Sequence, residues 1–190
     1  MPKILTLCLI TAATLAPFTA YAEDFYVGAD IAPGGNLTFT NPVNGKSAKS
    51  DGKTALKLYS GFAITDYLAI EGGFSQSGTT TFDKAALGLT QSPTFKMRSL
   101  YLAGRFTHKF NDDWSVFAKA GFARTRFTAF NGVSERDSLS STKPLLGLGV
   151  AYNVSKAVAL TLELEHIGRT RKSGLDVKQD ALHLGVKVGF

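Results

Sequence analysis

Apolar residues occupy every second position in most segments of this chain. In residues 181–190 the even positions hold leucine, valine and phenylalanine, whereas the odd positions hold alanine, glycine, His183 and Lys187. The same alternation recurs in residues 55–64 and 157–168. Because successive side chains of a β-strand point to opposite faces, each segment has one apolar and one more polar face. No apolar stripe with the period of a helix extends beyond three turns, so the sequence predicts an all-β fold.

Eight alternating segments can be counted in the chain. Each is about ten residues long, which is the length that a tilted strand needs to cross a lipid bilayer. Their approximate bounds are 25–31, 55–64, 67–75, 98–110, 114–127, 145–154, 157–168 and 180–190. The sequence therefore provides eight candidate membrane-spanning strands.

The connections between these segments alternate between short and long. The short ones, at 65–67, 111–113 and 153–156, contain Asn, Asp, Ser or Thr, whose side chains form hydrogen bonds that bend the chain. The long ones cover 33–54, 76–96, 128–143 and 169–179. Strict alternation places all long loops at one end and the short turns with both termini at the other, which is typical of outer-membrane barrels. We predict an eight-stranded antiparallel up-and-down transmembrane β-barrel in the bacterial outer membrane, with both mature termini periplasmic.

Residues 1–22 differ from the rest of the chain and are predicted to be a cleavable signal peptide. Lys3 precedes an apolar run from Ile4 to about Leu15, and residues 20–22 read Ala-Tyr-Ala, a pattern that a signal peptidase accepts. The alternative is a membrane anchor that stays attached. Cleavage would leave one domain, 23–190, without cysteine, because Cys8 is the only one in the sequence. Disulfides, thiolate metal sites and thiol catalysis are then excluded from that domain.

The charge of the mature chain narrows its partners. Without Lys3 it has 20 basic and 15 acidic residues, a net charge of +5. Anionic lipid and acidic glycans fit this charge, and export makes nucleic acid an unsuitable target. No segment after the signal approaches 18 consecutive apolar residues, so no helical span is expected there.

Alternation alone does not separate a membrane barrel from a secreted β-sandwich, whose apolar faces would point inward. Three features favour the barrel: a polar face rich in Gly and Ala, a C-terminus that ends on an aromatic residue, and aromatic residues where the apolar face reaches the turns. Such aromatic residues form a girdle at the lipid boundary of outer-membrane barrels. The predicted girdle consists of Phe25, Phe106, Trp114, Tyr152 and Phe190.

Charged residues of both signs are predicted to point into the barrel. An eight-stranded barrel has an interior just wide enough for side chains to fill, so charges inside it must be paired or hydrated. Two interpretations remain open: a cross-linked structural plug, and a gated path for ions or protons. The predicted interior set is Asp30, Lys57, Glu71, Arg105, Lys119, Glu163, Glu165 and Lys187, four acids and four bases.

Other basic residues are predicted on the outer rim, near the long loops. Arginine offers a forked guanidinium that suits phosphates and acidic sugars. We therefore predict contacts to lipopolysaccharide, with a merely solubilising rim as the alternative. The residues are Arg124, Arg126, Arg169, Arg171 and Lys172.

No catalytic or metal-binding constellation is recognised in the sequence. A base and a nucleophile on one strand face would need Ser or Thr two residues from a histidine, and His108, His166 and His183 have none there. His183 is expected inside the barrel near Lys187, and His166 on the outer wall. The chain is predicted not to be an enzyme and to hold no metal or cofactor.

Three short motifs, together with the signal, resemble small OmpA/OmpX-type barrels over the whole mature chain. They are 25–29 (FYVGA), 117–121 (FAKAG) and 185–190 (GVKVGF). The resemblance implies that Phe190 and its strand are read by the outer-membrane assembly machinery. Full-length OmpA proteins carry a further peptidoglycan-binding domain, which is not expected here.

The leading functional hypothesis is a monomeric barrel that supports envelope integrity or interacts with surfaces through four long external loops. The alternatives are a narrow ion-conducting pore and an enzyme that modifies lipopolysaccharide. Expected partners are outer-membrane lipid, lipopolysaccharide and the assembly machinery.

Overall fold

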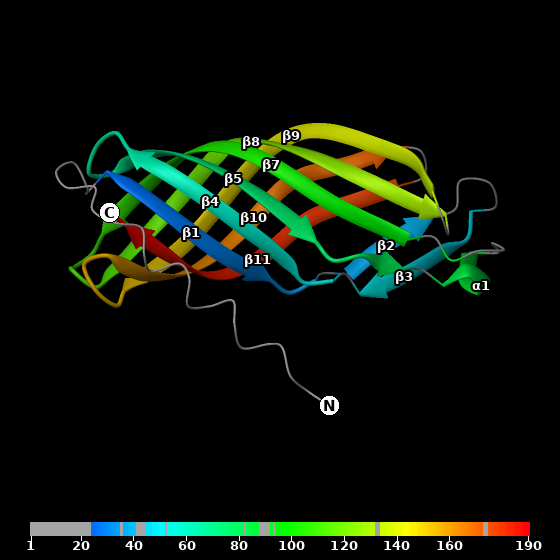
Figure 1. Cartoon of the computed structure of the whole chain (residues 1–190), viewed down its shortest axis with the longest axis horizontal. Helices are drawn as coiled ribbons and strands as arrows, with labels where there is room; N and C mark the ends of the chain where they lie inside the picture. The colour runs from blue at the N-terminus through cyan, green and yellow to red at the C-terminus, as the bar shows by residue number, and fades with distance from the viewer. Residues whose placement is uncertain are drawn as a thin grey trace, which may run out of the picture.

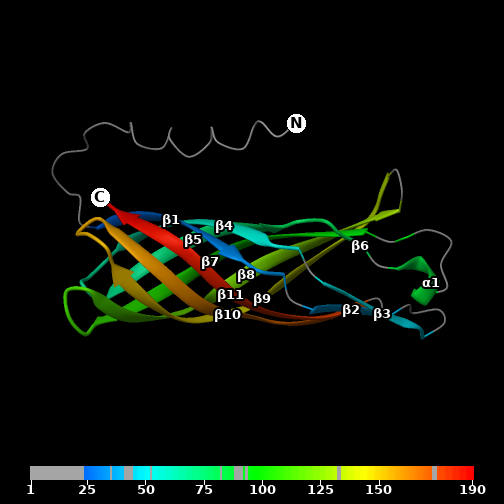
Figure 2. The same cartoon turned by 90° about the horizontal axis from the view of Figure 1, so that it is seen from below.

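The fold is a closed barrel of eight antiparallel strands (Figures 1 and 2), as the sequence predicts. The computed structural model describes residues 24–34, 36–40, 45–51, 53–81, 83–87, 92, 94–131, 134–172 and 175–190. The predicted signal peptide, 1–22, lies outside these residues. The barrel strands are β1 (Phe25–Ala32), β4 (Ala55–Ala63), β5 (Leu68–Ser77), β7 (Thr94–Lys109), β8 (Trp114–Asn131), β9 (Ser134–Asn153), β10 (Val158–Lys172) and β11 (Leu175–Gly189).

Each barrel strand pairs with the next one along the chain, and β11 pairs with β1 to close the sheet. Closure is fixed at the C-terminus, where the Phe190 amide donates a hydrogen bond to the Phe25 carbonyl at 2.9 Å. A closed sheet leaves no unpaired edge in the barrel wall, which is what a lipid environment requires. No helix among the described residues is long and apolar enough to span a membrane.

Three tight turns form one end of the barrel, which we call the turn end. In each, a side-chain oxygen accepts a hydrogen bond from the backbone amide three residues later: Thr65 from Leu68 at 3.1 Å, Asn111 from Trp114 at 2.7 Å, and Ser155 from Val158 at 3.1 Å. These side-chain bonds take the place of a longer loop, so the predicted short turns are confirmed. The described chain starts and ends here, and the C-terminus is marked in Figure 1.

The opposite end, which we call the loop end, is partly structured by additional elements. Strands β2 (Asn36–Thr40) and β3 (Ser47–Asp51) form a hairpin that joins β11 through the pair Phe39 and Leu175. Between β5 and β7 lie the short strand β6 (Thr80–Thr81) and the four-residue helix α1 (Lys84–Leu87). The first two predicted long loops therefore contain secondary structure of their own.

The prediction of loops at 128–143 and 169–179 was wrong. Pairing of β8 with β9 continues to Asn131 and Ser134, and pairing of β10 with β11 continues to Lys172 and Leu175. The strands β8 and β9 are 18 and 20 residues long, about twice the 9–11 residues that a membrane crossing needs. These parts were missed because a hairpin beyond the membrane is in water on both faces, so it needs no apolar alternation.

The outer wall of the barrel carries a continuous apolar band. On β8 the band runs from Trp114 to Phe122, nine residues that span roughly 20 Å along the barrel axis at ordinary strand rise and tilt. This height is close to the apolar band of about 25 Å in outer-membrane barrels. We call the band the apolar belt; on β7–β11 its exposed members include Leu100, Leu102, Phe122, Leu146, Leu148, Val150, Leu160, Leu162, Leu164, Leu182, Leu184 and Val186.

The five aromatic residues expected to form a girdle all lie on the outer wall at the turn end. Each side chain is between 39% and 50% exposed. Trp114 and Tyr152 are paired across β8 and β9 with ring centroids 4.9 Å apart, and Phe25 and Phe190 are 6.4 Å apart across the closing seam. Phe106, the fifth, contacts the ring of Tyr67 at 5.8 Å.

Candidate functional site: the charged lumen

The barrel interior contains charged side chains from seven strands. Seven of the eight predicted interior charges are buried, and Lys187 is partly buried. They come from β1 (Asp30), β4 (Lys57), β5 (Glu71), β7 (Arg105), β8 (Lys119), β10 (Glu163 and Glu165) and β11 (Lys187), together with His183 of β11. The strands turn these side chains inward by the same alternation that turns the leucines outward. Every barrel strand except β9 contributes at least one of these residues.

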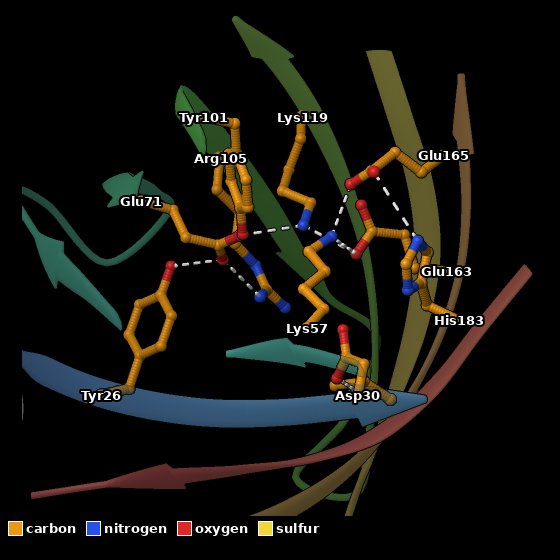
Figure 3. Close-up of polar contacts among 11 residues, drawn as sticks. Tyr26, Asp30, Lys57, Glu71, Tyr101, Arg105, Lys119, Glu163, Glu165 and His183 are labelled. Atoms are coloured by element: carbon orange, nitrogen blue, oxygen red, sulfur yellow. Dashed lines mark hydrogen bonds and ion pairs between the residues drawn. The ribbon is translucent and has the colours of Figure 1, made fainter. Parts of the chain in front are cut away.

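Glu71 is the central acceptor of one half of the interior (Figure 3). Its Oε1 accepts hydrogen bonds from the Tyr101 hydroxyl at 2.7 Å and the Lys119 Nζ at 2.8 Å. Its Oε2 accepts from the Tyr26 hydroxyl at 2.9 Å and an Arg105 Nη at 3.2 Å. A buried carboxylate is costly unless its lone pairs are satisfied, and here two cations and two hydroxyls satisfy them.

Lys119 joins Glu71 to the second half of the interior. Its Nζ lies 2.6 Å from Glu163 Oε2, and that same oxygen lies 3.4 Å from the Nζ of Lys57. Lys57 in turn lies 2.5 Å from Glu165, whose other oxygen lies 3.6 Å from His183 Nε2. The result is one unbroken series of alternating bases and acids across the lumen, drawn in Figure 3.

Two of the eight predicted interior residues do not join this series. The carboxylate of Asp30 accepts a hydrogen bond from the Thr161 hydroxyl at 3.4 Å, and the Lys187 Nζ lies 5.2 Å from the centroid of the Tyr26 ring. The structure therefore brings six of the eight together. His183, expected near Lys187, instead contacts Glu165 from the neighbouring strand.

Sequence reasoning assigned no part in this network to the interior tyrosines. Tyr26 and Tyr101 donate to Glu71, and both are inward by the same alternation that identified the charges. The available signal was a tyrosine at an inward position, because a buried hydroxyl needs a partner. Phe117 is also buried in the interior, and its contact with Arg105 was not foreseen: the guanidinium carbon lies 3.7 Å from the ring centroid.

Two glycines of strand β9 leave space in the barrel interior. A Cβ at Gly147 would contact both Glu163 and Lys119, and one at Gly149 would meet the Phe117 ring. The two glycines on the interior face of β9 thus leave room for large side chains from the neighbouring strands. The lumen is therefore filled across its width by interdigitating side chains, as expected for eight strands.

The tyrosine rings of β1 and β4 each cover a glycine of the other strand. Tyr26 lies opposite Gly61 and Tyr59 lies opposite Gly28 in the register. A Cβ at either glycine would overlap the ring that covers it. The two pairs join the first two barrel strands by direct packing.

We expect Gly28→Ala to lower the free energy of unfolding by about 1–3 kcal/mol, because the added methyl overlaps the Tyr59 ring. In the Gly28→Ala/Tyr59→Ala double variant that overlap is gone, so the effects should be coupled by at least about 0.5 kcal/mol. Urea unfolding of the folded barrel measures both values. Gly104→Ala is the matched control, because a Cβ there meets only a backbone oxygen at 3.9 Å. Strictly additive effects of the two substitutions would contradict the packing described.

The outer rim residues are only partly described. Arg124 and Arg126 are exposed on the outer face of β8, directly beyond Phe122 of the apolar belt. Arg169, Arg171 and Lys172 lie on the loop-end part of β10, and their side chains are outside the described set. The structure therefore places two of the five predicted lipopolysaccharide contacts on the outer wall.

One histidine makes a cross-strand pair on the outer wall. His166 of β10 lies opposite Asp180 of β11, and the Nδ1 and Oδ1 atoms are 2.5 Å apart. Both side chains are about half exposed at the loop-end border of the apolar belt. Among the described residues no group of three or more His, Cys, Asp or Glu side chains could hold a metal ion.

Comparison with known proteins agrees with this architecture. Neisserial surface protein A is similar with a TM-score of 0.66 and 22% identity, covering 87% of this chain and 97% of that chain. OprG from Pseudomonas aeruginosa has a TM-score of 0.65 and 14% identity, covering 89% and 96%. Ail of Yersinia pestis has a TM-score of 0.55 and 15% identity, covering 88% and 99%. These likenesses show the fold.

A search of curated protein sequences returns no significant match. The family model described as the outer membrane protein beta-barrel domain matches residues 5–190, nearly the whole chain. Together with the closed barrel and its apolar belt, this match places the protein in the bacterial outer membrane. The chain belongs to the outer membrane protein β-barrel domain family.

Proposed function

We propose that this protein is a non-conducting outer-membrane barrel that supports the envelope and interacts with other molecules at its loop end. In this proposal the turn end and both mature termini are periplasmic, the loop end is outside the cell, and the protein is a monomer without catalytic activity. The observation that carries it is the series of ion pairs from Arg105 to His183, which fills the lumen with mutually neutralised side chains.

The burial and pairing of the interior charges favour a structural plug and argue against an ion path. A conducting lumen needs groups that water and ions can reach, whereas Lys57 and Glu71 are 0% exposed. Their charges are taken up by protein partners at 2.5–3.4 Å. Apolar and aromatic side chains also fill the barrel interior, including Phe117 and Leu145, both at most 2% exposed.

The loop end supports the surface-interaction part of the proposal. There the β8–β9 and β10–β11 hairpins continue beyond the apolar belt, and the β2–β3 hairpin lies beside the β10–β11 hairpin (Figure 2). Paired strands hold these surfaces in a defined arrangement. Ail, a protein with the same fold, has been solved in complex with sucrose octasulfate, a heparin analogue, which makes anionic glycans a first class of ligand to test.

The turn end supports recognition by the outer-membrane assembly machinery. Phe190 is exposed beside Phe25 and follows an alternating strand with an apolar outer face. We include this aromatic C-terminus in the proposal as the signal that the machinery reads.

Purified wild-type protein in planar lipid bilayers is expected to show no single-channel conductance, because the lumen is filled. Arg105→Ala/Phe117→Ala removes the stacked guanidinium and ring from the lumen while keeping the contact between Glu71 and Lys119, and this variant should conduct. Phe122→Ala/Arg124→Ala removes the same residue types from the outer face of β8 and should stay silent. The difference between boiled and unboiled gel mobility checks that each variant is folded. Conductance by the folded wild type would contradict the plug and favour the narrow pore.

A further inference from the structure

Four cations gather on the outer wall at the loop end, on two neighbouring strands. They are Lys96 and Arg98 of β7 with Arg124 and Arg126 of β8, and we call them the cationic cluster. The three arginines are exposed and Lys96 is half-buried. All four occupy even positions, which on these strands face outward with the apolar belt. Lys96 and Arg98 were not among the sequence-predicted contacts.

The register places like charges directly opposite each other. Arg98 is the cross-strand partner of Arg126, so their Cβ atoms lie about 5 Å apart, and Arg124 is the diagonal neighbour of Arg98 at about 7–8 Å. Like charges directly opposite in a sheet destabilise it. The remaining register partners of the cluster do not offset this charge, because they are uncharged: Leu100, Gln76, Thr128, Ser140 and Thr142.

One arginine of the cluster is held in position by a neighbour. The Nε of Arg98 donates a hydrogen bond to the Gln76 side-chain oxygen at 3.0 Å. A guanidinium has five N–H donors, so four remain on Arg98 after this bond. An oriented planar fork of this kind matches the oxygens of a phosphate group better than an ammonium does.

The position of the cluster relative to the apolar belt determines the chemistry that its ligand must have. Arg98 precedes Leu100 by two positions on β7 and Arg124 follows Phe122 by two on β8, so each cation lies about 7 Å along its strand beyond the belt residue. A molecule in contact with both regions therefore needs apolar chains against the belt and an anionic group directly above them. A phosphorylated lipid of the surrounding leaflet has this chemistry.

We propose that the cationic cluster binds a phosphate of lipopolysaccharide, whose acyl chains lie along Leu100, Leu102 and Phe122. This inference rests on the proposed function, because it needs the loop end to lie in the leaflet that holds lipopolysaccharide. Binding offsets the repulsion between Arg98 and Arg126, so the cluster trades stability of the free barrel for affinity to the lipid.

The test compares Arg98→Gln/Arg126→Gln with wild type in detergent, using purified lipopolysaccharide as the probe. We expect affinity to fall about tenfold or more, given the strength of charge-assisted hydrogen bonds to phosphate. Without lipopolysaccharide the variant should be at least as stable to heat as wild type, because a repulsion is removed. Lys109→Gln/Lys156→Gln removes two exposed charges at the turn end and should bind like wild type.

Three results would overturn the proposal. They are unchanged affinity of the arginine variant, an equal loss in the lysine control, and equal wild-type affinity for lipopolysaccharide stripped of its phosphates. A fourth result would also overturn it. If phosphatidylglycerol vesicles stabilise the wild type against heat as much as lipopolysaccharide does, the site is generic for anionic lipid.

A separate experiment tests the orientation that the proposed function assumes. Labelling of Lys84→Cys on intact cells with an impermeant reagent reports which side of the membrane the loop end faces. The detergent binding experiment does not depend on that orientation, and the conductance experiment does not depend on the cluster. The binding, labelling and conductance experiments therefore distinguish a wrong site from a wrong orientation and from an open lumen.

Discussion

Glu71→Gln is expected to lower the free energy of unfolding by about 3–5 kcal/mol, the range for removing one partner of a buried ion pair. The substitution preserves the shape of the side chain but leaves Arg105 and Lys119 without the carboxylate that lies between them. Tyr26 and Tyr101 also lose a charged acceptor. Urea unfolding in lipid vesicles, followed by the fluorescence of Trp114, the only tryptophan in the chain, measures the change.

The controls for this prediction separate burial from charge. Asp66→Asn removes an exposed acid from the turn end and should change stability by less than about 0.5 kcal/mol. Glu71→Gln/Arg105→Met removes both poles of one ion pair and should recover part of the loss, because Arg105 then no longer lies unpaired and Lys119 keeps its ion pair with Glu163. A single variant within about 1 kcal/mol of wild type would show that the network contributes little to folding.

Leu148→Arg is expected to destabilise the barrel in a bilayer by about 2–4 kcal/mol, the cost of arginine on the lipid face at mid-membrane. Leu148 is 63% exposed and lies halfway along the belt on β9, between Tyr152 of the girdle and Pro144. The arginine side chain would be transferred from water into hydrocarbon. The same substitution at an exposed leucine of a water-soluble protein would leave the arginine in water and would not carry this cost.

Ser138→Arg on the same face of the same strand is the depth control. Ser138 is exposed beyond the belt at the loop end and lies opposite the uncharged Thr128, so the same substitution should cost no more than about 1 kcal/mol there. Both variants are measured by urea unfolding in vesicles. Equal costs at the two positions would mean that the belt does not face lipid.

The sequence predicted the wall of the barrel better than its contacts. Alternation placed Leu182 and Leu184 outside and Glu163 and Lys119 inside, because the direction of a strand side chain follows from parity alone. Which interior charges meet is a different question, since it depends on the tilt and stagger that bring β4 opposite β10 across the lumen. For this reason Asp30 was not excluded from the series. The contact of His183 with Glu165 depends instead on the register between the neighbouring strands β10 and β11, which parity alone does not give.

The loop end was predicted less well for a related reason. Between Thr128 and Lys143 the polar residues lie on both faces, and polarity was interpreted as a loop. Outside the membrane a hairpin needs only backbone pairing, and its length leaves no trace in the apolar pattern. Likewise the outward Arg98 was overlooked because it lies near the start of a segment, and its pairing with Arg126 depends on the register.

The lumen network also constrains the order in which the barrel can be assembled. Lys57 and Glu165 are separated by 108 residues, and Asp30 and Thr161 by 131, so these contacts form only when the first and last strands have come together. Bringing such distant segments together costs chain entropy before any contact repays it, and the interior charges stay costly until they are paired. A barrel that has inserted only some of its strands therefore gains little from this interior. We therefore expect most of the stability to be gained when β1 pairs with β11 and the sheet closes.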